Sequence, residues 1–333
     1  MKIAVIGAET LLGRELNEVL GARGTGIEII PYAANAEGSF TEEEGEAVYV
    51  QPLEAKAIHD YAALLVAGTR DGALKTYGLA KEASGHPVVV DCTGELENEP
   101  EARIAAPLGG SVETSASWLQ VIAHPAANAL ALVLMRLARY RPIRQAIAHI
   151  FEPASELGKR GISELQQQTT SLLSFKKLDK AVFDSQLSFN LLSAYGEEAA
   201  RKLVSVEQRI ERDLATIIGN TKSGAKTPMP SLRLLQAPVF HGYSISMWVE
   251  FESGVEAQAL GEALASAQIE VRGKADEPPD PVGAAGQSGL VAGDIRVDRN
   301  NARAAWFWIV GDNLRLMADA AAELLRGLKG ENG

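Results

Sequence analysis

A glycine turn of the kind that binds phosphate follows the first strand expected in the chain. The apolar run at 3–7 is too short for a buried helix and rich in β-branched residues, which predicts a central parallel strand. Gly7 ends this strand, and an amphipathic helix follows that Gly21 closes. Such a turn can hold a dinucleotide pyrophosphate on backbone N–H groups at the positive end of the helix. The candidate nucleotide contacts are Gly7, Ala8, Thr10, Leu11, Leu12, Gly13 and, in a second strand-to-loop turn, Gly68.

Two residues of this turn depart from the pattern for a dinucleotide. A G-x-x-G-x-x-G spacing would place glycine at position 10, where phosphate comes close to the backbone, but Thr10 stands there. Glu9 is expected to put a carboxylate beside the pyrophosphate, which favours the helix dipole and repels the ligand. The next strand, 27–32, ends without an acid for a ribose hydroxyl or a base for a 2′-phosphate. Binding of NADP or NAD therefore stays open, and the alternative is a turn that only joins strand to helix.

The single cysteine offers the only thiol in the chain. Cys92 follows the strand expected at 87–91 and would line the same crevice as the glycine turn. The alternative, which we favour, is a small residue packed at a strand end. One cysteine excludes an internal disulfide framework and fits a reducing compartment.

Length and charge set the class of protein. A chain of 333 residues, 46% apolar and 23% charged, is long enough for two globular domains. The net charge of −11 argues against nucleic acid or an anionic membrane as a partner. No signal peptide precedes the first strand, and the longest apolar stretch, 129–135, is too short to span a bilayer. We therefore expect a cytoplasmic protein with no nucleic-acid or membrane partner.

The order of elements predicts an α/β fold with two domains. Through about residue 123, strands alternate with helices, which is typical of a doubly wound parallel sheet. Its further strands are expected at 48–50, 62–67, 87–91 and 119–123. The second half is predicted to be α+β and mostly antiparallel, with strands at 143–151, 232–239, 244–251, 269–272, 289–297 and 304–310. Its long helices are expected at 124–139, 156–173, with a glutamine-rich exposed face, and 197–218, and a last amphipathic helix at 312–328 is expected to pack back on the first domain.

Several short segments occur in a fixed order over nearly the whole chain. They are G-A-x-x-x-x-G-R-E-L at 7–16, V-A-G at 66–68, V-V-D at 89–91, H-P at 124–125, A-S-E-L-G-K-R-G-I-S-E-L at 154–165, F-N at 189–190, A-P-V-F-H-G-Y-S at 237–244 and V-G-D-N-L-R at 310–315. Together they resemble the aspartate-semialdehyde dehydrogenase family. The resemblance implies a Rossmann-type nucleotide domain at 1–125 and 311–333, and a central domain at 126–310 that carries catalysis and a dimer interface. In that family the reaction is the phosphate- and NADP-dependent interconversion of aspartate semialdehyde and aspartyl phosphate, in the biosynthesis of lysine, threonine and methionine.

The resemblance also places the family's catalytic positions. In that chemistry a cysteine thiolate attacks the aldehyde, hydride passes to the nicotinamide, phosphate cleaves the thioester, and a histidine serves as acid and base. The nucleophile position falls on Ala127, and the histidine position falls on Tyr243. The substrate-binding arginine and glutamine fall on Gln236 and Glu152, and the phosphate-binding arginine falls on Glu97.

Every polar role is thereby lost or reversed in charge. Glu97 and Glu152 stand where an anionic substrate and phosphate should bind, and no covalent route remains once the nucleophile and its partners are gone. We therefore predict a catalytically degenerate homologue, which acts as a homodimeric scaffold, a ligand sensor or a partner of another enzyme. The alternative is an oxidoreductase that acts on an aldehyde with NAD(P) and uses Cys92 or a water in place of the lost thiol.

A new polar pocket at the former active site is a further hypothesis. The candidate pocket residues are Glu97, His124, Asn128, Glu152, His241 and Tyr243. Their sequence spacing follows no metal motif, so we predict no metal. Ordinary satisfied polar groups are the alternative, and we favour it. The run Trp306-Phe307-Trp308 alternates at strand period, which predicts core and interface positions.

Overall fold

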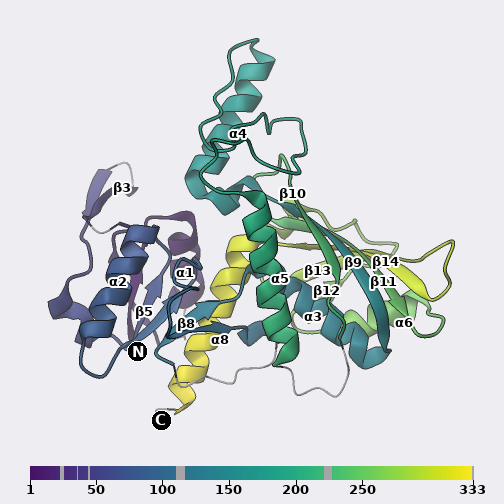
Figure 1. Cartoon of the computed structure of the whole chain (residues 1–333), viewed down its shortest axis with the longest axis horizontal. Coiled ribbons are helices and arrows are strands. Elements are labelled where there is room, and N and C mark those ends of the chain that lie inside the picture. The colour runs from purple at the N-terminus through teal and green to yellow at the C-terminus, as the bar shows by residue number, and fades with distance from the viewer. Residues whose placement is uncertain (23–25, 36, 44–45, 110–116, 221–226, 332–333) are drawn as a thin grey trace. The chain divides into compact units, whose positions relative to one another are not determined.

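The computed structural model describes the chain except residues 23–25, 36, 44–45, 110–116, 221–226 and 332–333. Its contacts divide it into two compact units. One comprises Met1–Ala123 with Met317–Gly333 (unit 1), and the other comprises His124–Leu316 (unit 2). Each unit is built on a six-stranded sheet (Figure 1). In the part of the chain that the structure describes, no helix is long and apolar enough to cross a membrane.

Unit 1 contains the predicted parallel sheet. Its strands are β1 (Lys2–Ile6), β2 (Glu28–Tyr32), β5 (Ala63–Val66), β6 (Val88–Asp91), β7 (Ala102–Ala105) and β8 (Leu119–Ile122). They lie in the order β2-β1-β5-β6-β8-β7, and every pairing is parallel. The chain thus winds outward from β1 in both directions, which confirms the doubly wound α/β fold. Strand β7 was not predicted from the sequence, because its four residues alternate in burial and form no apolar run.

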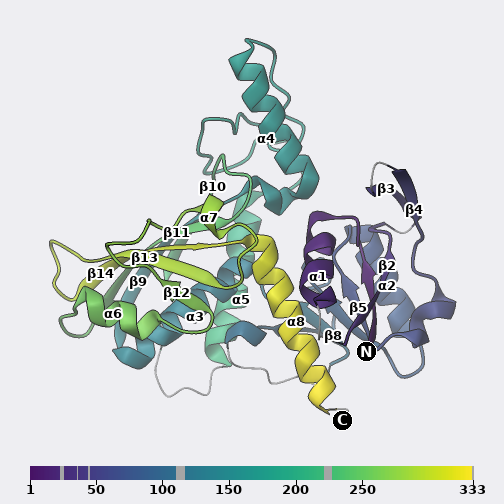
Figure 2. The same ribbon diagram turned by 180° about the vertical axis from the view of Figure 1, so that it is seen from behind.

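The two faces of this sheet are buried against different helices. Ile3 and Val5 enter a core with α1 (Leu11–Gly21) and with α8 (Asn313–Glu331), which buries Leu324 among others. The alternating residues of β1, Ala4 and Ile6, enter a second core with α2 (Arg70–Glu82) and the 3₁₀ helix η1 (Ala55–Asp60). Figure 2 shows the yellow α8 beside α1. Apolar residues at successive positions of β1 are needed because both faces of a parallel sheet are covered.

One predicted strand does not belong to the parallel sheet. The segment expected at 48–50 is part of β4 (Glu46–Val50), which pairs antiparallel with β3 (Ser39–Glu43) in a separate two-stranded sheet. An antiparallel partner needs only a short connection, whereas a parallel one needs a crossover. Strand β3, which lies immediately upstream in the sequence, therefore pairs with this segment.

Unit 2 contains a mixed sheet. Its strands are β9 (Ile143–Glu152), β10 (Ser231–Gln236), β11 (Tyr243–Phe251), β12 (Ile269–Val271), β13 (Leu290–Val297) and β14 (Ala304–Gly311). The order is β10-β9-β11-β14-β13-β12. The three inner pairings are antiparallel, as predicted, but the edge strands β10 and β12 pair parallel with their neighbours.

The helices of unit 2 differ in detail from the sequence-based prediction. They are α3 (Pro125–Tyr140), η3 (Ala154–Leu157), α4 (Gly158–Leu173), α5 (Leu203–Gly219), α6 (Ala257–Leu264) and α7 (Pro281–Ala284). Helix α3 packs against α5, α6 and β9. Helix α5 begins later than expected, since the chain before it is held elsewhere: the backbone of Leu192 exchanges two hydrogen bonds with that of Gln236.

Helix α4 organises the irregular segment that follows it. The sequence predicted a glutamine-rich exposed face. Gln166 and Gln167 are exposed, but Gln168 is fully buried. Its side-chain amide donates to the carbonyls of Asp179 and Ser185, and its oxygen accepts from the N–H groups of Leu187 and Ser188. A buried polar side chain is stable here because each of its groups has a partner. These hydrogen bonds hold the backbone of residues 179–188 against α4.

Candidate functional site

The first turn of α3 keeps the shape of a helix start but presents no nucleophile. Ala127 lies in this turn with no exposed surface. His124 caps the helix. Its side-chain Nδ1 accepts from the Ala126 N–H at 3.3 Å, and its backbone N–H donates to Asp213 Oδ2 at 2.8 Å. The backbone is therefore fixed as a nucleophile would require, but the side chain at its centre is a methyl group.

The imidazole of His124 is neutral. Burial and the nearby cations Arg209 and Arg201 hold the pKa of His124 well below its usual range. Because Nδ1 accepts a hydrogen bond, the ring proton resides on Nε2. Nε2 lies 4.0 Å from Glu156 Oε2, which is too far for a hydrogen bond, and with a neutral ring this contact is no ion pair.

Glu156 is the centre of a polar network in unit 2. Its Oε1 accepts from the Tyr243 hydroxyl at 2.6 Å and from Asn313 Nδ2 at 2.9 Å. The Asn313 oxygen in turn accepts from Ser155 Oγ at 3.0 Å and from the Gly242 N–H at 3.2 Å. The 3₁₀ helix η3, the start of β11 and the start of α8 are tied together through this carboxylate.

A second carboxylate, Glu152, is completely buried next to the first. Arg201 Nη1 lies 3.0 Å from Glu152 Oε1, and Arg201 Nη2 lies 3.9 Å from Glu156 Oε2, so one guanidinium serves two acids. The Tyr195 hydroxyl lies 3.2 Å from Glu152 Oε1 and donates to Gln236 Oε1 at 2.6 Å. Gln236 donates through Nε2 to the carbonyls of Glu152 and Ala237.

The electrostatics of this network oppose the family's chemistry. The pKa of Glu152 is raised to about 7, mainly by burial and also by the nearby Glu156, while Arg201 opposes both. Burial and the same two carboxylates raise the pKa of Tyr243 well above its ordinary value. A phenol of this kind does not exchange its proton near pH 7, so Tyr243 cannot replace a catalytic imidazole.

The structure brings only part of the predicted pocket together. Glu152, Tyr243 and His124 surround Glu156 and Arg201, whereas the half-buried His241 has no part in this network. Asn128 is buried in α3, and its N–H donates to the His124 carbonyl. Glu97 is half-buried in unit 1, in the turn after β6. Among the described residues no cluster of three His, Cys, Asp or Glu side chains could hold a metal ion.

Cys92 is a core residue rather than a crevice residue. It is 2% exposed and packs in the core between the sheet of unit 1 and helices α1 and α8. Burial, with Asp91 beside it, raises the pKa of the Cys92 thiol far above neutrality. A thiol with this environment is not the reactive thiolate that covalent catalysis needs.

Sequence reasoning missed the residues that hold the two acids. Glu156, Ser155 and Asn313 stand in two of the quoted segments, but nothing in the segments assigned them a partner. Tyr195 and Arg201 lie in the irregular stretch before α5, which has neither strand nor helix periodicity. Only the tertiary path of that stretch brings them to Glu152.

The glycine turn of unit 1 has the backbone geometry of a phosphate site. Gly7 has a φ of +95°, and a Cβ atom added there would lie 2.6 Å from Gly68 Cα. A Cβ atom on Gly68 would lie 2.4 Å from the carbonyl oxygen of Ala34, just after β2. The N–H groups of Leu11 and Leu12 in the first turn of α1 have no acceptor within the helix. The chain's own residues therefore fit a pyrophosphate at this turn.

Thr10 and Glu9 both have hydrogen-bond partners within unit 1. Thr10 caps α1: its hydroxyl accepts from the Gly13 N–H at 2.9 Å and lies 2.9 Å from the Ala67 carbonyl oxygen. The Glu9 carboxylate was expected beside the pyrophosphate. Instead its Oε1 accepts from the Ala34 N–H at 2.8 Å and from the Ser39 hydroxyl.

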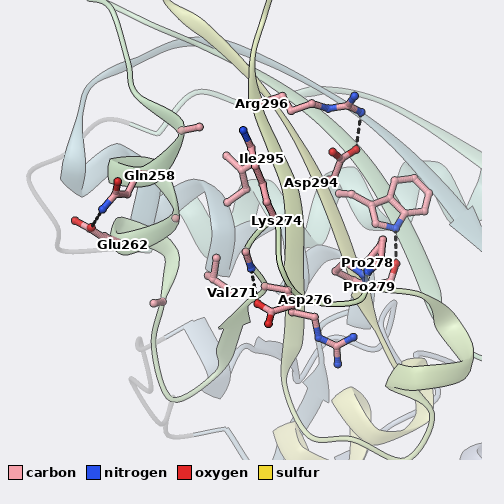
Figure 3. A pocket seen from close by; sticks show the side chains of 16 residues that line it. Gln258, Glu262, Val271, Lys274, Asp276, Pro278, Pro279, Asp294, Ile295 and Arg296 are labelled. Atoms are coloured by element: carbon pink, nitrogen blue, oxygen red, sulfur yellow. Dashed lines mark hydrogen bonds and ion pairs between the residues drawn. The ribbon is translucent and has the colours of Figure 1, made fainter.

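Unit 2 also has a cavity of about 1040 Å³, which is lined by residues of α6, of β13 and of the segment that follows β12 (Figure 3). Its apolar lining includes Val271, Ile295 and Pro279, and its rim is charged. Several of the rim groups are paired locally, as in the contact between Arg296 and Asp294 at 2.5 Å. None of its lining residues belongs to the network around Glu156, so the two are separate.

Comparisons with a family model, with relatives and with a solved structure give consistent matches. The family described as "Semialdehyde dehydrogenase, dimerisation domain" matches residues 136–316. A "USG-1 protein homolog" of Azotobacter vinelandii is 28% identical over 97% of both chains. The aspartate-semialdehyde dehydrogenase of Rickettsia bellii is 28% identical over 94% of this chain and 93% of its own. The structure of a probable aspartate-semialdehyde dehydrogenase from Pseudomonas aeruginosa superposes with a TM-score of 0.81 at 25% identity, and covers 100% of this chain and 99% of its own.

Proposed function

Because the chain belongs to the semialdehyde dehydrogenase family, we propose that it is a homodimeric member without the family's thiol-dependent, NADP-dependent reductive chemistry. In this proposal it acts as a binding, sensor or scaffold protein, and its single cysteine supports a cytoplasmic location. The observation that carries the proposal is the first turn of α3, where the nucleophile position holds the buried methyl group of Ala127. A methyl group cannot form the thiohemiacetal that precedes hydride transfer.

The surrounding charges support the same conclusion. An anionic substrate entering this region would meet Glu152 and Glu156, while the Arg201 guanidinium already contacts both. Like charges in a buried site cost several kcal/mol, on the order of what distinguishes right from wrong partners. The network therefore favours its own side chains over the family substrate.

We expect no reduction of NADP that depends on aspartate semialdehyde and phosphate. Loss of a nucleophile costs on the order of 10⁶-fold in turnover, because the covalent route is removed as a whole. The measurement is absorbance at 340 nm with purified protein over a range of phosphate concentrations. Turnover above a no-enzyme control would contradict the proposal, and loss of that turnover in Cys92→Ser would then favour the alternative aldehyde oxidoreductase.

Restoring the thiol alone is expected to leave the protein inactive. Ala127→Cys adds the nucleophile, but Tyr243 still cannot act as base and Glu152 still repels the substrate. The same assay should show less than about 10⁻³ of a competent homologue's rate, since removing acid–base catalysis alone costs about 10²–10⁴-fold. A larger gain would mean that the remaining positions are not obstacles.

The proposed dimer uses the open face of the sheet in unit 2. Ile147, Trp248 and Trp306 stand opposite one another on β9, β11 and β14, so they form one row across three strands. Ile147 is 40% exposed and Trp306 is 39% exposed, whereas the alternating residues Met247 and Phe307 are buried. A contiguous apolar row on one face is typical of an interaction surface, and the dimerisation-domain match supports a second copy of this chain as its partner.

Charge placed in this row should dissociate the dimer. Trp306→Glu is expected to weaken self-association at least about tenfold, because aromatic side chains at the centre of an interface carry most of its energy. Sedimentation velocity over a concentration series measures this. Val204→Glu is the matched control, since Val204 is 59% exposed on α5, which packs against α3. An unchanged dimer in Trp306→Glu would place the interface elsewhere.

A second candidate function is a sensor of dinucleotide. The observation that favours it is the phosphate-site geometry at Gly7, Gly68 and the start of α1. Calorimetric titration with NADH and NADPH tests it, and the absence of binding at millimolar nucleotide would leave the scaffold function alone.

A further inference from the structure

We propose that Asp298 is a positioning residue of the dimer interface, because it holds the two tryptophans of the apolar row in the orientation that a second copy of this chain meets. The inference rests on the homodimer proposed above. It goes further, because it names the side chain that prepares this surface for its partner before the two copies associate.

The position of Asp298 on the sheet places its carboxylate beside this row. Strand β13 ends at Val297, and the Asp298 N–H donates to the Ala304 carbonyl at 2.8 Å, so the pairing with β14 continues past the end of the strand. Two residues earlier, Arg296 stands opposite Trp306. Side chains two residues apart in a strand leave the same face, so Asp298 and Trp306 share the open face of the sheet.

One carboxylate oxygen of Asp298 accepts from both indoles. The Trp248 Nε1–H donates to Asp298 Oδ2 at 2.7 Å, and the Trp306 Nε1–H donates to the same atom at 3.1 Å. The other oxygen, Oδ1, accepts from the Asn300 backbone N–H at 2.8 Å, so the carboxylate itself is held in place. The Asn300 N–H and the two indoles hold the pKa of Asp298 below its usual range, and it therefore stays a charged acceptor at neutral pH.

These bonds fix how the two indoles lie on the sheet. Trp248 and Trp306 pair directly across β11 and β14, and Trp306 is 39% exposed. An indole whose N–H already has an acceptor at the sheet can be covered by a partner without leaving a buried donor unsatisfied. Its ring is also ordered in advance, so association loses less side-chain entropy.

The next tryptophan on this face is held in a different way. Trp308 donates through Nε1 to the Pro279 carbonyl at 2.9 Å. Pro279 itself lies against β13, since a Cβ atom added to Gly293 would lie 2.6 Å from Pro279 Cδ. A segment of the same chain thus lies beside Trp308, whereas the pair held by Asp298 is offered to a second copy.

The test is the dissociation constant of the dimer, measured by sedimentation velocity over a concentration series of the full chain. Asp298→Ala should raise it at least about tenfold, because two indoles in each copy lose their acceptor and their fixed orientation. Asp298→Asn keeps an oxygen for the indoles and should raise it less than about threefold. Asp276→Ala is the matched control, since this exposed aspartate accepts from the Gly273 N–H in another loop of unit 2, and it should leave the constant unchanged.

A double-mutant cycle separates positioning from a general effect on the fold. Trp306→Phe removes one of the N–H groups but keeps an aromatic ring. If Asp298 acts through the indoles, the double variant Asp298→Ala/Trp306→Phe should fall at least about threefold short of the product of the two single effects. A merely structural role of Asp298 at the end of β13 would give the full product.

Each outcome decides the inference. A wild type that stays monomeric at every concentration would overturn the proposed dimer, and the inference with it. A dimer that Asp298→Ala leaves unchanged, or that Asp298→Asn weakens as much as Asp298→Ala, would keep the homodimer but overturn the role of Asp298. If Asp298→Ala does not fold, Asp298→Ser takes its place with the same expected loss, because a serine hydroxyl can accept from the Asn300 N–H but is too short to hold both indoles.

Discussion

Arg201→Met should destabilise unit 2 by about 3–5 kcal/mol at pH 8, because it leaves Glu152 and Glu156 buried together without their shared cation. The measurement is urea unfolding followed by tryptophan fluorescence. Of the four tryptophans, Trp248, Trp306 and Trp308 lie in unit 2, so the signal mainly reports that unit.

Two further variants separate this effect from general damage. Arg326→Met removes an exposed arginine that pairs with Glu323 on α8, and an exposed pair of this kind is worth at most about 1 kcal/mol. In the double variant Arg201→Met/Glu152→Gln, one buried charge is removed with its partner, so at least about 1 kcal/mol should be recovered. A loss in Arg201→Met no larger than that in Arg326→Met would show that the two acids do not depend on Arg201.

Glu152→Gln should stabilise unit 2 at pH 8 and have little effect at pH 5. The pKa of Glu152 is about 7 in the folded protein, above the ordinary value of 4.5, and burial is the main cause. The folded state therefore binds more protons than the unfolded state between pH 4.5 and 7, and stability falls as the pH rises through this range. The whole shift corresponds to about 3 kcal/mol, which glutamine, as a neutral isostere, does not lose.

The pH dependence is the decisive part of this prediction. Glutamine still offers an oxygen to Arg201 Nη1 and to the Tyr195 hydroxyl, so the packing changes little. Glu250→Gln is the matched control, because Glu250 is 5% exposed and is contacted by two arginines, Arg303 at 2.9 Å and Arg144 at 4.0 Å. That variant should lose stability. If Glu152→Gln lost stability equally at pH 5 and pH 8, Glu152 would be an ordinary paired carboxylate.

Together these variants test what the two buried acids contribute to unit 2. Glu152 and Glu156 tie η3, the segment before α5, the start of β11 and the end of β9 into one hydrogen-bonded unit. A fully partnered network of this kind holds one arrangement of these segments.

The sequence determined the fold class and the absence of a thiol at position 127. Apolar runs such as 3–7 can be buried only between two helical layers, so the parallel sheet follows from local composition. The absence of a thiol at Ala127 is likewise a fact of the sequence, because no fold can give a methyl group a lone pair.

The tertiary structure alone decided where the charged side chains act. From its position in the turn, Glu9 was predicted to lie beside the pyrophosphate. Its carboxylate lies at the end of β2, where the Ala34 N–H and the Ser39 hydroxyl donate to it. No role could be predicted for Arg201, since the irregular stretch before α5 has no periodicity from which the direction of its side chain could be inferred. Long polar side chains reach across elements that are distant in sequence, so their partners are set by the packing of those elements and not by their spacing.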